Sequence, residues 1–253
     1  MDAIYAAISD RARRIAARYP PPSFYTVHSR EHAFSRRFFE ADDTVARLHE
    51  YAAARLDDDL GHGLCHVTKV TLDAGTLVLV EEGAGGRPGR ETLRRLLLVQ
   101  CAGLLHDIAR KEKDHALRGA EMASQILRDY PMSDEEAGDV CRAIANHEAF
   151  KTPHAAGTLQ GGLLSDCLYD ADKFRWGPDN FTDTVWHMIS YYKAPLSVFL
   201  SRYSSGIESI IRIKSTFRSA TGRLYGPEFI ETGLAIGEEI YRMLREEFSR
   251  ETA

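Results

Sequence analysis

The sequence lacks any apolar run of the roughly 18 residues that a helix needs to cross a bilayer. Residues 1–20, MDAIYAAISDRARRIAARYP, are amphipathic and lack the apolar segment and small-residue cleavage site of a signal peptide. The chain also lacks a basic excess, since its formal net charge is −5, and this disfavours nucleic acid as a partner. We therefore expect a cytoplasmic protein with no membrane partner, for which a nucleic-acid partner is disfavoured.

Cysteine is scarce in the sequence and never closely paired. The cysteines form no C-x-x-C motif, which argues against a zinc ribbon or a thioredoxin-like redox site. Each lies among apolar neighbours, so we interpret all of them as small buried hydrophobic residues in a reducing compartment: Cys65, Cys101, Cys141 and Cys167.

The chain shows no internal repeat, no low-complexity tract and no series of alternating strands. Its hydrophobic content of 44% is ordinary for a globular protein and allows a core. Apolar residues recur at helical spacing, most clearly over 66–78 and 91–108. Although TLVLV (76–80) alone is typical of a strand, the helical pattern continues through it. We therefore predict an all-α fold of about ten helices.

Turn residues and caps indicate where the helices begin and end. The runs GAGGRPGR (83–90) and KTPHAAGTLQGG (151–162) predict loops. Ser133 and Glu136 form the S-x-x-E pattern of a capping box, which predicts that a helix begins there. Further helices are expected over four ranges: 163–175, 181–200, 205–220 and 227–249.

Polar side chains lie beside these apolar stripes: His62, His66, His106, Asp107, His115, His147, Asp170 and Asp172. Taken singly, each is explained by a structural hydrogen bond or by a place on the surface. Together, imidazoles and carboxylates are the ligand types that hold Zn²⁺, Mn²⁺ or iron. His106 and Asp107 are consecutive, and on a helix such neighbours diverge by about 100°, so one can bind a metal end-on while the other bridges. The set predicts a metal site.

The order H…HD…D, formed by His66, His106, Asp107 and Asp172, resembles the HD superfamily of metal-dependent phosphohydrolases. In the family's last motif the second aspartate is the ligand, which points to Asp172 rather than Asp170. The flanking residues are also similar to the family's motifs, in three segments: HVTKV (66–70), AGLLHDIA (102–109) and DADKF (170–174).

The resemblance covers residues 55–178 and implies an HD core there. We expect this core to be an HD-domain helical bundle within a single all-α domain over 1–253. Segments 1–50 and 179–253 resemble nothing that we can identify, and we expect helical extensions in both. The C-terminal segment is rich in aromatic residues. It has three interpretations: a cover over the site, a homodimer interface, or packing in the core, of which core packing is favoured.

Two further segments, HALRGAEMA (115–123) and AIANH (143–147), are similar to motifs of bacterial diadenosine tetraphosphate hydrolases in this superfamily. The resemblance implies that one divalent metal, which is Mn, Fe, Zn, Mg or Ni, binds to His66, His106, Asp107 and Asp172. It also implies a second metal on Asp107, His115 and His147. Without that second metal, the two histidines would contact substrate.

Hydrolysis at such a site needs an activated water and cations that hold the phosphate. We assign Asp107 two roles, as a ligand and as the group that orients the attacking water. Lys69 lies one turn after His66 and is the first candidate for a catalytic contact with phosphate, with Arg110 as a further substrate contact. His62, one turn before His66, is a candidate ligand, general acid or pocket-lining residue.

The expected function is hydrolysis of a nucleotide or another small phosphorylated substrate. The sequence lacks the G-Y-P signature of cyclic-di-GMP phosphodiesterases, which argues against that activity. Two alternatives stay open: a di-iron oxygenase of the same fold and ligand set, and a non-catalytic nucleotide-binding HD domain. The sequence is equally compatible with two roles for Lys173 and the pair Arg175–Trp176: these residues close the site, or they cap the helix.

Overall fold

The structure is a computed structural model that describes residues 1–57, 60–85 and 87–251, with only the backbone for 248–251. Within these ranges there is no strand, so the all-α prediction is confirmed. Residue 86 of the predicted loop, residues 58–59 of the expected core and residues 252–253 of the expected extension lie outside the described residues.

The α-helices are, in chain order, α1 (Ala3–Ala16), α2 (Ser23–Val27), α3 (Ser29–Ala41), α4 (Asp43–Ala53), α5 (Leu64–Glu81), α6 (Arg90–Leu105), α7 (His115–Ile126), α8 (Asp134–Ala145), α9 (Leu159–Phe174), α10 (Val185–Tyr191), α11 (Leu196–Ile213) and α12 (Ala220–Glu251). A 3₁₀ helix, η2 (Leu127–Asp129), follows α7, and a π-helix, η3 (Asn180–Thr184), precedes α10. No helix among the described residues is long and apolar enough to span a bilayer.

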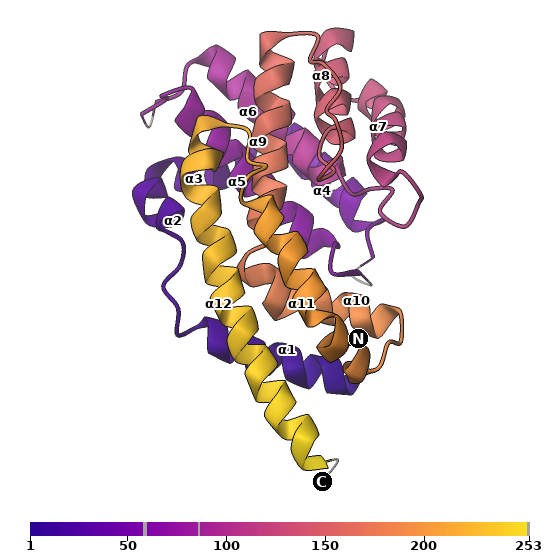
Figure 1. The fold of residues 1–253 in the computed structure, drawn as a ribbon. Coiled ribbons are helices and arrows are strands. Elements are labelled where there is room, and N and C mark those ends of the chain that lie inside the picture. Colours follow the sequence, from indigo (N-terminus) through magenta and orange to yellow (C-terminus); the bar gives the residue numbers. More distant parts are fainter. Residues whose placement is uncertain (58–59, 86, 252–253) are drawn as a thin grey trace.

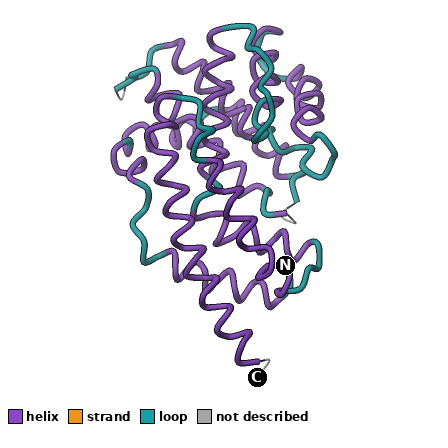
Figure 2. Tube along the Cα trace, in the orientation of Figure 1, coloured by secondary structure: helices purple, strands orange, loops and turns teal. Residues whose placement is uncertain are grey.

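Helix α5 lies at the centre of the fold and packs against α3, α6 and α9, while α8 contacts α6, α7 and α9. Figure 1 shows α12 running from beside this bundle to the opposite end of the molecule, where α1 crosses it. Figure 2 shows the same helices joined by loops at their ends. Because α1 contacts η3 and α10 as well as α12, the N-terminal helix packs against the C-terminal part of the chain.

Close packing of α5 and α6 fixes one side of the later site. Helix α5 is buried along most of its length, which explains why TLVLV (76–80) is helical as predicted. At Gly103 of α6, a Cβ atom would lie 2.7 Å from the Cα of Thr71, so a side chain there would force the helices apart. This close approach holds the end of α6, just before His106, against the part of α5 that carries His66.

Caps at the N-termini position α8 and α9. The hydroxyl of Ser133 accepts from the N–H of Glu136 at 3.2 Å, and the Glu136 carboxylate accepts from the N–H of Ser133 at 2.7 Å, so the predicted capping box is confirmed. The hydroxyl of Thr158 accepts from the N–H of Gly161 at 2.8 Å. Because of this cap, α9 begins earlier than residue 163, the predicted start.

The boundaries predicted for the helices at 181–200 and 205–220 are wrong. The chain breaks at 192–195, and α11 then runs without interruption through the position where the predicted break lay. Lys193 has a positive φ of 50°, and Pro195 disfavours helical backbone in the residue before it. The helix predicted at 227–249 also begins earlier, because α12 continues through Pro227.

The prediction that every cysteine is buried is only partly correct. Cys101 and Cys167 are buried, Cys141 is partly buried, and Cys65 is exposed. Cys65 lies in the first turn of α5, where the neighbouring helices cover only part of the surface. Apolar neighbours in the sequence therefore do not ensure burial at a helix end.

Asp170 of α9 holds the start of α12. Its buried carboxylate accepts from the backbone N–H groups of Arg218 at 2.8 Å and Ser219 at 2.7 Å. Burial raises the pKa of Asp170 to about 6, although these hydrogen bonds act in the opposite direction. Gly222 leaves room for the carboxylate, because a Cβ at that position would collide with it. The long C-terminal helix is thereby fixed to the helix that carries Asp172.

Replacing Asp170 should weaken this attachment. Asp170→Ala leaves one buried and one partly buried N–H group without an acceptor, so we expect the free energy of unfolding to fall by about 2 kcal/mol. Urea denaturation followed by circular dichroism measures the change. Asp166→Ala is the control, since Asp166 lies one turn earlier on α9 and accepts neither of these hydrogen bonds. An equal loss in both variants would contradict this role of Asp170.

Candidate metal centre

The residues predicted as metal ligands converge at one place, although they come from distant parts of the chain. They are His66 in the first turn of α5, His106 and Asp107 after α6, His115 at the start of α7, His147 after α8 and Asp172 near the end of α9. All of them except His115, which is partly exposed, are buried. The cluster forms because α5, α6, α8 and α9 pack on one another and bring these ends together.

His66, His106 and Asp172 form a first group of possible ligands. The Nε2 atom of His66 lies 3.3 Å from Nε2 of His106 and 3.3 Å from Oδ1 of Asp172. The Nε2 atom of His106 lies 3.8 Å from the same oxygen. Ligands about 2.1 Å from one tetrahedral ion lie roughly 3.4 Å from each other, so these separations suit a shared ion.

Asp107, His115 and His147 form a second group. The Oδ1 atom of Asp107 lies 3.7 Å from Nε2 of His115 and 3.5 Å from Nε2 of His147, and these two nitrogens are 3.2 Å apart. Arg110 faces this group, because its Nη1 donates to Nε2 of His115 at 3.0 Å and lies 3.9 Å from Oδ1 of Asp107. A cationic side chain is thus already placed against the second group.

Asp107 takes part in both groups through different oxygens. Its Oδ2 atom lies 3.7 Å from Nε2 of His66 and 3.5 Å from Nε2 of His106, whereas Oδ1 faces the second group. Oδ1 is buried and accepts no hydrogen bond from any described residue. A buried carboxylate oxygen without a partner is unfavourable unless a cation or a water binds it. The Asp107 carboxylate is therefore suited to bridge two bound species.

Hydrogen bonds fix which nitrogen of two histidines carries the proton. The Nδ1 atom of His106 donates to the carbonyl of Gly103 at 2.8 Å, and that of His147 donates to the carbonyl of Ile144 at 2.6 Å. A neutral ring that donates through Nδ1 presents a lone pair at Nε2. Burial lowers the pKa of His106 to about 4, so this ring is neutral at pH 7. The Nε2 lone pairs of these rings and the nearby carboxylates point toward one another, and a divalent cation bound between them would accept both kinds of ligand.

His62 lies at the edge of the first group. One of its ring nitrogens lies within 4.8 Å of ligand atoms from His66 and Asp107, so these residues make a further possible ligand set. Its Nδ1 donates to the carbonyl of Leu60 at 2.8 Å, which leaves a lone pair at Nε2. Burial lowers the pKa of His62 to about 3. His62 is therefore an acceptor at neutral pH and not a proton donor.

The cluster opens into a cavity of about 540 Å³. Three cations border it, Arg110, Lys173 and Arg175, and the Lys173 ammonium is paired with Asp172. The remaining wall is mostly apolar and includes Phe150, Trp176, Val185, Met188 and Ile210. The last three come from α10 and α11, so the C-terminal segment covers the site. Its aromatic content was the only signal of this in the sequence, and it did not indicate which residues reach the cavity.

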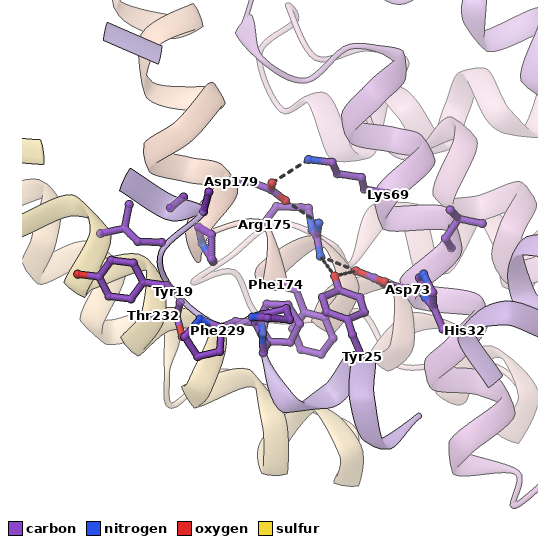
Figure 3. Close-up of a pocket in the computed structure, with 18 of the residues that line it drawn as sticks. Tyr19, Tyr25, His32, Lys69, Asp73, Phe174, Arg175, Asp179, Phe229 and Thr232 are labelled. Atoms are coloured by element: carbon purple, nitrogen blue, oxygen red, sulfur yellow. Dashed lines mark hydrogen bonds and ion pairs between the residues drawn. The ribbon is translucent and has the colours of Figure 1, made fainter. Parts of the chain in front are cut away.

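Lys69, which the sequence suggested as a catalytic phosphate contact, does not line this cavity. Its ammonium lies 2.7 Å from Asp179, which also binds Arg175 (Figure 3). The spacing of three residues correctly places Lys69 beside His66 on α5, but the long side chain reaches toward Asp179 instead. The cations that do reach the cavity from the predicted core are Arg110, Lys173 and Arg175.

The HD pair itself does not lie on a helix, contrary to the expected divergence of about 100° around one. Helix α6 ends at Leu105, and His106 and Asp107 occupy the turns that follow. The chain then passes through Asp114, which has a positive φ of 54°, and α7 begins at His115. The two ligands of the pair are therefore oriented by a turn that also returns His115 to the cluster.

The metal-free protein should lose stability on acidification. The folded-state pKa of His106 is about 4, below the ordinary 6.5, because the ring is buried. Between these values the unfolded chain binds a proton that the folded chain does not, so stability is complete above pH 6.5 and falls toward pH 4. Asp107 and Asp172 have pKa values well below the ordinary one, which extends the loss below pH 3.8.

We expect His106 alone to contribute roughly 3 kcal/mol of this loss, since its pKa differs by about 2.5 between the two states. Urea denaturation over a pH series in the presence of EDTA measures it. His106→Asn is the comparison, because its side chain does not titrate, and its stability should depend less steeply on pH. A wild-type stability that is constant from pH 6.5 to pH 4 would contradict the neutral, buried state of His106.

Comparison with known proteins identifies the domain that carries this cluster. Residues 63–176 match the model of the family described as HD domain. Searches of the curated proteins and of the solved structures found no match. The matched range contains all the converging ligands, from His66 to Asp172. Residues 63–176 of this chain therefore form an HD domain, the helical domain of a superfamily of metal-dependent phosphohydrolases.

Proposed function

We propose that this protein is a metal-dependent phosphohydrolase that acts on a nucleotide or another small phosphoester. The observation that carries the proposal is that the histidine and aspartate cluster opens into a cavity bordered by Arg110 and Lys173. Phosphoryl transfer depends mainly on positioning and on stabilisation of negative charge, which cations beside a metal centre provide. The HD-domain match supports the same class of reaction.

We assign the metal ligands from the two groups of converging atoms. The first divalent ion is assigned to His66, His106, Asp107 and Asp172. A second ion is assigned to Asp107, His115 and His147. The guanidinium of Arg110 faces this second group, so it supplies positive charge there when only the first ion is bound.

The charges around the cluster favour an anionic substrate once an ion is present. The cavity lining carries three carboxylates, those of Asp107, Glu148 and Asp172, and three cations, Arg110, Lys173 and Arg175, so these charges balance. A divalent ion then leaves two positive charges in excess, which complements a phosphate monoester dianion. This excess favours an anionic, phosphorylated substrate over an uncharged one.

Residues of the chain supply the other requirements of the proposed hydrolysis. A bound divalent ion supplies Lewis acidity to the phosphoryl oxygens and lowers the pKa of water in the site. Asp107 orients the attacking water through Oδ1, which accepts no hydrogen bond from the described residues. Arg110 holds a phosphoryl oxygen at the cavity wall, and His62 accepts a hydrogen bond at its edge. Trp176 and Met188 pack against the rest of the substrate and exclude water from it.

Removal of Asp107 tests both the metal site and the reaction. Asp107→Ala eliminates the carboxylate shared by the two groups, so we expect loss of bound metal and of turnover together. Elemental analysis of protein purified without chelator gives the metal per chain, and release of inorganic phosphate from a panel of phosphoesters with Mn²⁺ gives the turnover. Asp166→Ala should retain both. Full metal content and full rate in Asp107→Ala, or turnover only with iron and O₂, would overturn the proposal.

Removal of Arg110 tests the substrate contact separately. Arg110→Ala keeps every assigned ligand but removes a cation from the cavity, so we expect KM to rise about tenfold, equivalent to ~1.4 kcal/mol of binding free energy. Steady-state kinetics on the best phosphoester from the panel measures it. Arg118→Ala is the matched control, since Arg118 pairs with Glu121 on the exposed side of α7. An unchanged KM in Arg110→Ala would remove this residue from the substrate site.

A further inference from the structure

Arg175 borders both the metal cavity and a second cavity of about 510 Å³ (Figure 3). The second cavity lies where the HD domain meets the segments on either side of it. Its lining comes from the N-terminal segment, from α5 and from α12, and includes Tyr19, Arg36, Lys69, Asp73, Phe229 and Thr232. Only Lys69 and Asp73 of these lie within the range that matches the HD family. The cavity therefore depends on the flanking segments of this chain.

A buried network centred on Arg175 forms one wall. Its guanidinium binds the Asp73 carboxylate, the hydroxyl of Tyr25 at 2.8 Å and the Asp179 carboxylate at 2.5 Å. Tyr25 also donates to Asp73 at 2.9 Å, and Lys69 donates to Asp179 at 2.7 Å. Each acid on the lining is thus already paired with a cation. The network leaves no carboxylate free to attract a cationic ligand.

Arg36 gives the lining its excess of positive charge. It is exposed at the rim of the cavity and has no hydrogen bond or ion pair with any described residue. Burial lowers the pKa of the neighbouring His32, so that ring is neutral at neutral pH. Three cations therefore face two carboxylates, and the buried Nε of Arg175 has no acceptor among the described residues. Positive charge therefore exceeds negative charge on the lining, and one buried hydrogen-bond donor lacks an acceptor.

The rest of the lining is apolar and flat. The ring of Phe229 stacks on that of Phe174 with centroids 4.1 Å apart and planes 4° apart. Figure 3 shows these rings below the network, with Tyr19 and Thr232 on the side away from Asp73. A cavity of this volume holds a small molecule, and stacked aromatic faces suit a flat apolar body.

We propose that this cavity binds a small organic anion. Its anionic group faces Arg36 and Lys69, and its flat apolar body packs against the wall formed by Tyr19 and Phe229. Nothing in the HD-domain match assigns a ligand to this place.

Arg175 connects this site to the metal centre. It lies one turn after Asp172, while Asp73 lies two turns after His66 on α5, so the Arg175–Asp73 pair ties together the ends that carry these ligands. An anion that competes with the Asp179 carboxylate for Lys69 and Arg175 shifts the position of Arg175 and so alters the Arg175–Asp73 pair. By thermodynamic linkage, the anion and the metal then change each other's affinity by the same factor. This part of the inference rests on the proposed metal site.

Binding is tested on the metal-free protein with 8-anilinonaphthalene-1-sulfonate, an aromatic anion whose fluorescence rises when its rings leave water. We expect saturable binding that Arg36→Glu weakens about tenfold by charge reversal. Arg37→Glu makes the same change at the next, equally exposed residue, which does not line this cavity, and should bind as the wild type does. Thr232→Trp fills the cavity and should abolish binding.

Undiminished binding in Arg36→Glu, or an equal loss in Arg36→Glu and Arg37→Glu, would overturn the site. The coupling is tested by calorimetric titration with Mn²⁺ in the presence and absence of the same probe. We expect the probe to change the Mn²⁺ affinity of the wild type about threefold or more and to leave that of Arg36→Glu unchanged. An unchanged wild-type affinity would overturn the coupling. Absence of any Mn²⁺ binding would instead contradict the proposed metal site, since probe binding does not depend on it.

Discussion

The constraint on which this structure depends is the burial of hydrogen-bond acceptors against one another. The Nε2 atoms of His66 and His106 are 3.3 Å apart, and carboxylate oxygens of Asp107 and Asp172 lie among them. In a metal-free protein these lone pairs and negative charges repel and have lost their water. The packing around them, including the close approach of α5 and α6 at Gly103, must offset that cost. The rigid bundle therefore holds an arrangement that the proposed metal ion would make favourable.

The residues that converge could be identified from the sequence because they lie near helix ends, where local structure orients side chains. His106 and His147, for example, are oriented by carbonyls three residues earlier in the chain. The position of Lys69 was not predictable in the same way. Its partner Asp179 is 110 residues away, and no local pattern reveals that the two side chains meet. Spacing along a helix predicts which face a residue occupies but not where a long, flexible side chain ends.

The C-terminal helices show a second limit of the sequence. The break expected between residues 200 and 205 lies inside α11, although Ser204, Ser205 and Gly206 have low helix propensity. Tyr203 stacks on Tyr241 of α12 with ring centroids 4.1 Å apart, so packing between the two helices outweighs the local preference. The all-α class was predictable because helical spacing is a local pattern, and the break before Pro195 had a local signal in that proline. The continuity of α11 depends instead on how distant helices meet.

The division between the HD domain and its flanks has a functional consequence. The ligand cluster lies wholly within residues 63–176, but α10 and α11 complete the metal cavity, and the N-terminal segment and α12 complete the second one. Buried ion pairs such as Arg175–Asp73 are poor sources of stability, because desolvation opposes their attraction. Their value here lies in geometry, since Arg175 joins the end of the HD domain to α2 through Tyr25. The domain therefore supports the proposed reaction class, while the segments outside it shape both cavities.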